Sequence, residues 1–234
     1  MMACGRQDID ARQLQAPQVN EPQLSLTGAS DKVVFVLVHG GGPQFAVTLK
    51  KLQQFLTEDG VPASRIYMPT YDHKTSTAVM SVVVGNQIKE IVQQHGEDVE
   101  LHVWTHSLGN YIAMRALATA NLSQYVAKYI GLAGVAFGQN SKPRFCTRVT
   151  CPPYMDEMTP YKGAFIEDFW DTYSAEILQW DHCALYSRSD RRVKDPYDSG
   201  VIADGTGYEV DGVSHLGFAR SRRSYQLVKQ YCYD

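Results

Sequence analysis

Short apolar runs alternate along the chain with longer stretches in which apolar residues recur at helical spacing. The first run, 32–38, is almost continuously apolar and β-branched, which is typical of a strand buried on both faces. Further short runs predict strands at 65–68, 99–104, 126–132, 183–187 and 207–210. The longer stretches predict helices at about 44–58, 76–94, 107–120 and 218–231. This alternation predicts an α/β fold, with a mostly parallel central sheet and helices on both faces.

Two stretches break the alternation. Residues 1–30 are polar, rich in glutamine and without a sustained apolar period, so we expect an N-terminal tether there. The rest of the chain, 31–234, is predicted to form one domain. Within it, residues from about 134 to 181 contain two adjacent prolines and many aromatic side chains. Because structureless stretches of that length are uncommon, we expect a short helix around Ile166 and Trp170, which stand at helical spacing.

The composition narrows the class of protein. A chain of 234 residues can bury a core without the help of metals or disulfides. The apolar fraction is 44%, the charged fraction is 20% and the net charge is −3, so the composition does not favour binding to nucleic acid. The sequence also has no run of about 18 apolar residues, the length needed to span a bilayer. We therefore expect a soluble globular domain with no nucleic-acid partner and no obligate protein partner.

The five cysteines bear on where the protein resides. The opening residues, MMACG, resemble the end of a bacterial lipoprotein signal, which predicts export and membrane anchoring through Cys4. A disordered tail with an incidental cysteine is the alternative. The other four cysteines form an even set, and one pairing fits an oxidising, periplasmic or extracellular setting: Cys146 with Cys151, and Cys183 with Cys232. Buried free thiols are the alternative to these disulfides.

A serine motif stands where a predicted strand ends and a predicted helix begins. The residues from Thr105 to Gly109 read Thr-His-Ser-Leu-Gly, with Ser107 at the centre. A strand–serine–helix turn of this kind resembles the nucleophile elbow of α/β-hydrolases, in the His-Ser-Leu-Gly form of small bacterial lipases and esterases. Thr105 departs from the small residue usual at that position. A serine that merely caps the helix is the alternative for Ser107.

The histidine that would serve as the base is found by chain order. Of the seven histidines, only His182 and His215 follow Ser107, and only His215 also follows a candidate acid after a late strand. Serine, acid and then histidine is the order of the α/β-hydrolase fold. The segment Gly-Val-Ser-His-Leu-Gly around His215 also resembles the segment that carries the base in lipases of this type. A histidine in an ordinary polar turn is the alternative.

The third member of the triad is predicted to be Asp190. It lies in Ser-Arg-Ser-Asp-Arg-Arg-Val, directly after the strand expected at 183–187, and this segment resembles the acid-bearing loop of the same families. A carboxylate is needed there to orient the histidine and to stabilise its protonated form. Asp195 and Asp198 are alternatives. The arginines at 191 and 192 leave open that Asp190 belongs to a surface charge cluster.

The glycines after the first strand complete the resemblance. His39-Gly40-Gly41-Gly42 resembles the His-Gly-Gly signature of lipases and esterases, whose backbone approaches the substrate. The resemblance implies that Gly41 and Leu108 supply the backbone N–H groups of an oxyanion hole. His39 is expected to be a scaffold residue. The segment lacks the glycine spacing and the Gly-Lys-Ser/Thr ending of phosphate-binding loops.

Taken together, these motifs imply a serine carboxylester hydrolase that acts through an acyl-serine intermediate on a small-molecule or lipid ester. The sequence has no metal-ligand motif, and we expect no metal and no other cofactor. The stretch 134–181 would be a cap or lid, with packing of its aromatics on the domain body as the alternative. An acyltransferase or serine peptidase with the same triad, or a noncatalytic lipid-anchored binding protein, remains open as a function.

Overall fold

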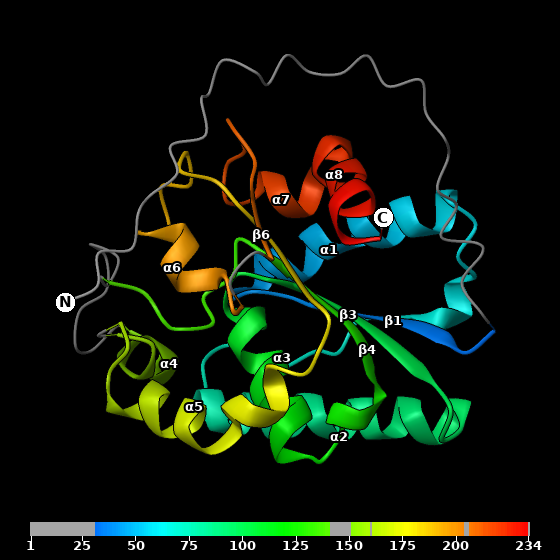
Figure 1. The fold of residues 1–234 in the computed structure, drawn as a ribbon, viewed down its shortest axis with the longest axis horizontal. Helices are drawn as coiled ribbons and strands as arrows, with labels where there is room; N and C mark the ends of the chain where they lie inside the picture. The colour runs from blue at the N-terminus through cyan, green and yellow to red at the C-terminus, as the bar shows by residue number, and fades with distance from the viewer. Residues whose placement is uncertain (1–30, 141–150, 160, 204–205, 234) are drawn as a thin grey trace, which may run out of the picture.

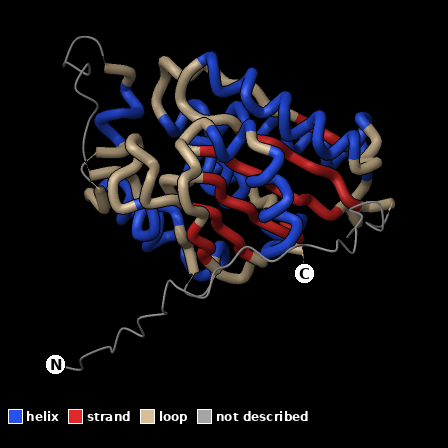
Figure 2. The backbone as a smooth tube through the Cα atoms, turned by 90° about the horizontal axis from the view of Figure 1, so that it is seen from above, coloured by secondary structure: helices blue, strands red, loops and turns tan. Residues whose placement is uncertain are grey.

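The computed structural model describes residues 31–140, 151–159, 161–203 and 206–233 (Figures 1 and 2), and the tether predicted at 1–30 lies outside them. Its centre is a six-stranded sheet in the order β2-β1-β3-β4-β5-β6. The strands are β1 (Val33–Val38), β2 (Ile66–Tyr67), β3 (Glu100–His106), β4 (Val126–Leu132), β5 (His182–Tyr186) and β6 (Gly207–Glu209). Every neighbouring pair is parallel, which confirms the predicted parallel sheet.

Helices cover both faces of this sheet, as the alternation predicts (Figure 1). One face carries α1 (Pro43–Glu58), α7 (Gly217–Arg220) and α8 (Arg222–Cys232). The opposite face carries α2 (Thr77–His95), α3 (Leu108–Thr119) and α5 (Ala164–Ile177). Two short helices, α4 (Pro153–Glu157) and α6 (Pro196–Gly200), lie together at one end of the molecule, and 3-10 turns at Ala63–Arg65 and Ser123–Tyr125 precede β2 and β4.

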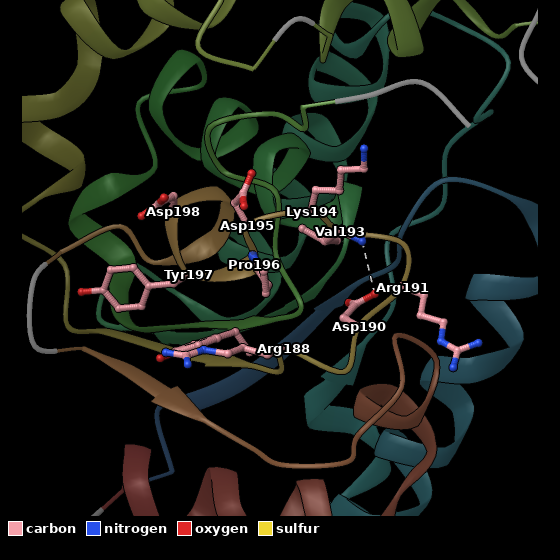
Figure 3. A pocket seen from close by; sticks show the side chains of 10 residues that line it. Arg188, Asp190, Arg191, Val193, Lys194, Asp195, Pro196, Tyr197 and Asp198 are labelled. Atoms are coloured by element: carbon pink, nitrogen blue, oxygen red, sulfur yellow. Dashed lines mark hydrogen bonds between the residues drawn. The ribbon is translucent and has the colours of Figure 1, made fainter. Parts of the chain in front are cut away.

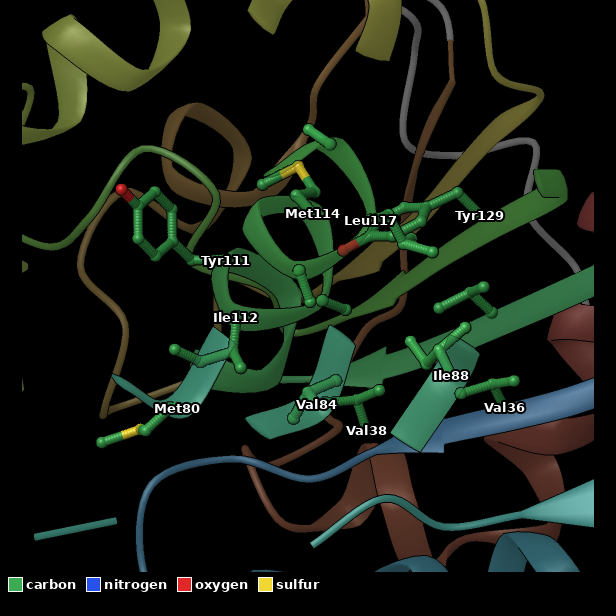
Figure 4. Close-up of a cluster of buried hydrophobic side chains, with 14 of the residues drawn as sticks. Val36, Val38, Met80, Val84, Ile88, Tyr111, Ile112, Met114, Leu117 and Tyr129 are labelled. Carbon is green, nitrogen blue, oxygen red and sulfur yellow. The ribbon is translucent and has the colours of Figure 1, made fainter. Parts of the chain in front are cut away.

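The strand β1 shows why the sheet has two cores. All six of its side chains are buried, because successive residues of a strand point to opposite faces and both faces are covered. One set packs among α2 and α3 (Figure 4): Val34, Val36 and Val38. The other set joins α1, α7 and α8: Val33, Phe35 and Leu37. The apolar run at 32–38 is therefore explained by burial on both sides.

The order of the strands fixes where a site can form. From β1 the chain moves to β2 at the edge of the sheet, then returns to the other side of β1 to form β3. Connections therefore leave β1 and β3 in opposite directions, and the crevice at such a switch point is where open α/β sheets bind ligands. Val38 pairs with Thr105 in the register of these strands. The loop that begins at His39 and the turn at Ser107 thus meet at the carboxyl edge.

One helix differs from the sequence-based expectation, and the stretch expected to form a cap contains the helix expected around Ile166 and Trp170. The helix predicted at 218–231 is divided into α7 and α8 at Ser221, whose backbone is extended. The side-chain oxygen of Ser221 caps α8 by accepting a hydrogen bond from Ser224 N at 3.4 Å. The predicted cap at about 134–181 contains α5, which connects β4 to β5 and packs beside α3. Ile166 and Phe169 of α5 are buried in the same core as α2 and α3. This helix therefore covers one face of the sheet.

A disulfide joins Cys183 of β5 to Cys232 at the end of α8, with their Cα atoms 5.6 Å apart. This confirms the second of the two predicted pairings. Cys151 is also disulfide-bonded, while Cys146, the partner predicted for it, lies outside the described residues, as does Cys4. In the described part of the chain, no helix has both the length and the apolar character that a membrane span requires.

Removing the Cys183–Cys232 bond should weaken the fold substantially. The bond links residues 49 positions apart, and restricting a loop of that size in the unfolded chain is worth about 4 kcal/mol. We expect Cys232→Ser to lower the free energy of unfolding by about that amount, as measured by urea denaturation without reductant. The same titration with dithiothreitol is the control, because it should shift wild type much further than the variant. An unchanged urea midpoint in Cys232→Ser would contradict a stabilising effect of this disulfide.

Candidate active site

The turn between β3 and α3 holds Ser107 in a strained backbone conformation. Its φ is 56°, in a backbone region that residues other than glycine rarely adopt, and this conformation costs about 1–3 kcal/mol. The turn fits because α3 begins almost in contact with the end of β1. A Cβ atom added to Gly109 would lie 2.3 Å from the carbonyl oxygen of His39 and 2.4 Å from that of Val38. Any larger residue at 109 would push the helix, and the serine with it, away from β1.

Thr105 occupies its unusual position because two partners bind its hydroxyl. The side chain is fully buried, donates to the carbonyl of Ile130 on β4 at 2.9 Å and accepts from Asn110 Nδ2 at 3.1 Å. The backbone carbonyl of Asn110 in turn accepts from the Tyr129 hydroxyl at 2.5 Å. These bonds tie the first turn of α3 to β4. A threonine therefore fits at position 105 because its hydroxyl is hydrogen-bonded on both sides.

His215 lies between the serine and the predicted acid. Its Nε2 is 2.9 Å from Ser107 Oγ, and its Nδ1 is 2.7 Å from Asp190 Oδ2. The two contacts place a proton donor, a base and a carboxylate in one hydrogen-bonded row. His215 is 5% exposed, while Ser107 is half-buried and remains accessible. Three residues predicted from separate motifs, up to 108 positions apart, are therefore brought together.

The loop after β5 holds Asp190 in its ionised form. Burial alone would raise the pKa of its carboxyl, but the hydrogen bonds from His215 and from the backbone N–H groups of Arg192 and Val193 outweigh burial and lower it. Those N–H groups lie 2.8 Å and 3.2 Å from Asp190 Oδ1. The alternative Asp195 accepts a hydrogen bond from Asn140 and stands at the start of α6.

Asp198, the other alternative, lies inside α6. A cavity of about 630 Å³ borders the loop of Asp190 (Figure 3). The figure shows the Arg191 side chain extending away from the Asp190 carboxylate, and Asp190 itself is only 6% exposed. Ser107 and His215 are not among the cavity's lining residues, which are Tyr186, Arg188, Asp190, Arg191, Val193, Lys194, Asp195, Pro196, Tyr197 and Asp198. The cavity therefore flanks the acid and does not lie over the serine.

His106 contacts the main chain of His215, and this contact is not evident from the sequence motif. Its Nε2 donates to the backbone carbonyl of His215 at 2.8 Å, and the two rings lie 4.8 Å apart. Burial lowers the pKa of His106 to about 3, so its ring stays neutral. His106, the neighbour of Ser107 in the chain, thus holds the main chain of His215 in place.

The two residues predicted to form the oxyanion hole are neighbours in the fold. Gly40 packs against Ser107, since a Cβ atom there would be 2.9 Å from Ser107 Cβ. A Cβ atom on the next residue, Gly41, would be 3.2 Å from Leu108 Cδ2. Leu108 opens α3, where backbone N–H groups have no acceptor within the helix. An anion at this position would also be stabilised by the helix dipole.

The scaffold role expected for His39 agrees with its contacts. Its ring stacks on Tyr71 with centroids 4.2 Å apart, and its Nδ1 lies 2.7 Å from the carbonyl of Gly40. The Tyr71 hydroxyl donates to the carbonyl of His39 itself. Burial lowers the pKa of His39, which favours the neutral ring. Among the described residues, no group of three histidine, cysteine or acidic side chains is arranged to hold a metal ion.

Comparison with known proteins identifies the architecture. No protein-family model and no curated protein sequence matches the chain. The mature Bacillus licheniformis lipase BlEst2 superposes with a TM-score of 0.66 and 14% identity, covering 91% of this chain and 94% of the lipase. Aspergillus fumigatus lipase B gives a TM-score of 0.65 at 13% identity, covering 84% of this chain and 51% of the lipase. The chain has the α/β-hydrolase fold.

A further protein with this α/β-hydrolase fold shares a smaller part of it. Phospholipase PlaB from Legionella pneumophila superposes with a TM-score of 0.54 and 15% identity over 66% of this chain. The chain spans 37% of the length of PlaB, so it corresponds to one part of that protein. At identities of 13–15%, these likenesses establish the α/β-hydrolase fold and leave function to be argued from the site.

The neutral His106 should make stability depend on pH. Its pKa is about 3 in the fold and 6.5 ordinarily, so the unfolded chain binds more protons between these values and the fold loses stability as pH falls through them. We expect His106→Gln to remove up to about 1.4 kcal/mol per pH unit of this dependence. Urea denaturation from pH 7 down to pH 4 measures it, and pH 7 to 9, where the imidazole is neutral in both states, is the internal reference. Equal slopes in variant and wild type would contradict the assignment.

Proposed function

We propose that this protein is a serine carboxylester hydrolase that acts through an acyl-serine intermediate. The observation that carries the proposal is the hydrogen-bonded row from Asp190 through His215 to Ser107. This arrangement is the one that converts a serine hydroxyl into a nucleophile on many unrelated folds. The strained turn at Ser107 and the carboxyl edge on which it lies add support, because α/β-hydrolases carry their nucleophile there.

Each group has a defined task in the proposed reaction. Ser107 Oγ attacks the ester carbonyl carbon while His215 Nε2 takes its proton, and Asp190 stabilises the imidazolium that results. The carbonyl oxygen gains a negative charge and is bound by the backbone N–H groups of Gly41 and Leu108. His215 then protonates the departing alcohol. A water molecule, deprotonated by His215, releases the acid from the serine in the second half of the cycle.

The substrate class follows from the surroundings of the proposed oxyanion site. The side chain of Leu108 approaches Gly41, so the proposed carbonyl-binding site has an apolar wall beside its backbone donors. An apolar wall next to a carbonyl-binding site favours a small-molecule or lipid ester over a charged one. The proteins of similar fold described above are named as lipases and a phospholipase, which supports the same class.

We also propose that the protein works in an oxidising compartment. The Cys183–Cys232 bond supports this, because disulfides persist in exported proteins and are rare in the cytosol. Cys4 lies outside the described residues, and anchoring through it remains part of the proposal. Intact-mass analysis after metabolic labelling with a fatty-acid probe would test for a lipid on that residue.

A fluorophosphonate probe tests the nucleophile directly. Ser107 should displace fluoride and form a stoichiometric adduct, located by peptide mass spectrometry. We expect Ser107→Ala not to react and His215→Ala to react about 10,000-fold more slowly, because the triad acts as a unit. His95→Ala is the matched control: His95 contacts Tyr67 at the far end of α2, so its loss should leave the rate unchanged. Folded wild type that stays unlabelled would refute the proposed function.

The acid can be tested by comparing two aspartates of the same loop region. Asp190→Asn should lower kcat for an aryl ester by about 10,000-fold, because an amide cannot hold the histidine in the required tautomer. Asp195→Asn should leave kcat close to that of wild type, since Asp195 bonds to Asn140. Steady-state kinetics on the two purified variants decide between them. The reverse result would assign the role of the acid to Asp195.

A further inference from the structure

The hydroxyl of Tyr154 lies beside Gly41, one of the two residues of the proposed oxyanion site. Tyr154 belongs to the short helix α4, in the segment that connects β4 to β5. A Cβ atom added to Gly41 would lie 2.6 Å from Tyr154 Oη and 3.0 Å from its Cζ. The same point lies 3.2 Å from Leu108 Cδ2. The phenol and the Leu108 side chain therefore approach Gly41 from the same side, next to a backbone N–H group that is proposed to bind the oxyanion.

This hydroxyl is a donor without an assigned task. Tyr154 is 9% exposed, and no hydrogen bond of its hydroxyl is found within the described part of the chain. Buried tyrosines normally satisfy that group. The Tyr71 hydroxyl, for example, donates to the carbonyl of His39, and that of Tyr129 donates to the carbonyl of Asn110. Burial also raises the pKa of Tyr154, so its proton remains available for donation.

The helix that carries this phenol is anchored to the body of the domain. The carboxylate of Glu157 accepts from the backbone N–H of Thr77 at 2.6 Å, at the first residue of α2. Met158, which follows α4, is 1% exposed, and its carbonyl accepts from Gln139 N at 3.0 Å. These contacts hold α4 against the start of α2 and against the segment that follows β4. A donor held in this way is oriented before substrate arrives, which is what electrostatic stabilisation of a transition state requires.

We propose that Tyr154 is a further catalytic residue, whose hydroxyl donates a third hydrogen bond to the oxyanion beside the N–H groups of Gly41 and Leu108. The inference rests on the proposed function. As Ser107 Oγ bonds to the carbonyl carbon, the π electron pair moves to the carbonyl oxygen and His215 takes the serine proton. The Tyr154 O–H bond stays intact throughout. When the intermediate collapses, the electron pair returns, the bond to the alcohol breaks and His215 delivers its proton to that alcohol.

Tyr154→Phe removes the donor and keeps the ring. Because the hydroxyl has no partner in the described chain, the melting temperature should not change. We expect kcat for an aryl acetate to fall on the order of 100-fold, with KM nearly unchanged, since the bond strengthens as charge develops on the oxygen. Tyr173→Phe is the matched control: Tyr173 is a half-buried phenol of α5 that packs on Phe169. Its loss should leave kcat unchanged.

A trifluoromethyl ketone provides a second readout that a purely structural effect would not reproduce. The ketone adds to Ser107 and forms a tetrahedral oxyanion, so its inhibition constant in Tyr154→Phe should rise by the factor by which kcat/KM falls. An unchanged kcat, or a lowered kcat with unchanged ketone binding, would overturn the inference while the proposed function stands. Wild type that neither hydrolyses esters nor reacts with the fluorophosphonate would overturn both.

Discussion

The close contact between α3 and the end of β1 is the constraint on which the site depends. Gly109 allows the backbones to approach to a distance that no side chain would permit, and this approach bends the chain so sharply that Ser107 adopts a positive φ. The same contact brings Leu108 beside Gly41 and packs Gly40 on the serine. The proposed nucleophile and the proposed oxyanion site thus both depend on one close packing contact at the switch point of the sheet.

The polar groups behind the serine hold distant loops in register. Thr105 bonds to β4, His106 to the main chain of His215, and Asp190 to both His215 and its own loop. A buried polar group is costly when unpaired, so each of these bonds disfavours arrangements in which one loop has moved. A row of three side chains from three strand ends can therefore keep its spacing, although each loop alone would be variable.

How much of this could be read from the sequence depended on the range of the interaction. Local apolar runs such as 32–38 predict buried strands, and Ser107 and His215 stand in recognisable local motifs. The stretch 134–181 was harder, because the apolar spacing of α5 is the same whether the helix covers a sheet or caps a site. The contact of His106 with a residue 109 positions away, and that of Tyr154 with Gly41, arise only from tertiary packing.

Thr105 has a consequence for how such proteins are recognised. A search pattern that requires glycine or alanine two residues before the serine would pass over this chain. Yet the threonine is accommodated because a strand carbonyl and an asparagine amide bind its hydroxyl. The position is therefore governed by what the neighbouring backbone can accept as much as by side-chain size. A threonine here and an asparagine five residues later form a paired signature, by which related sequences with the same substitution could be found.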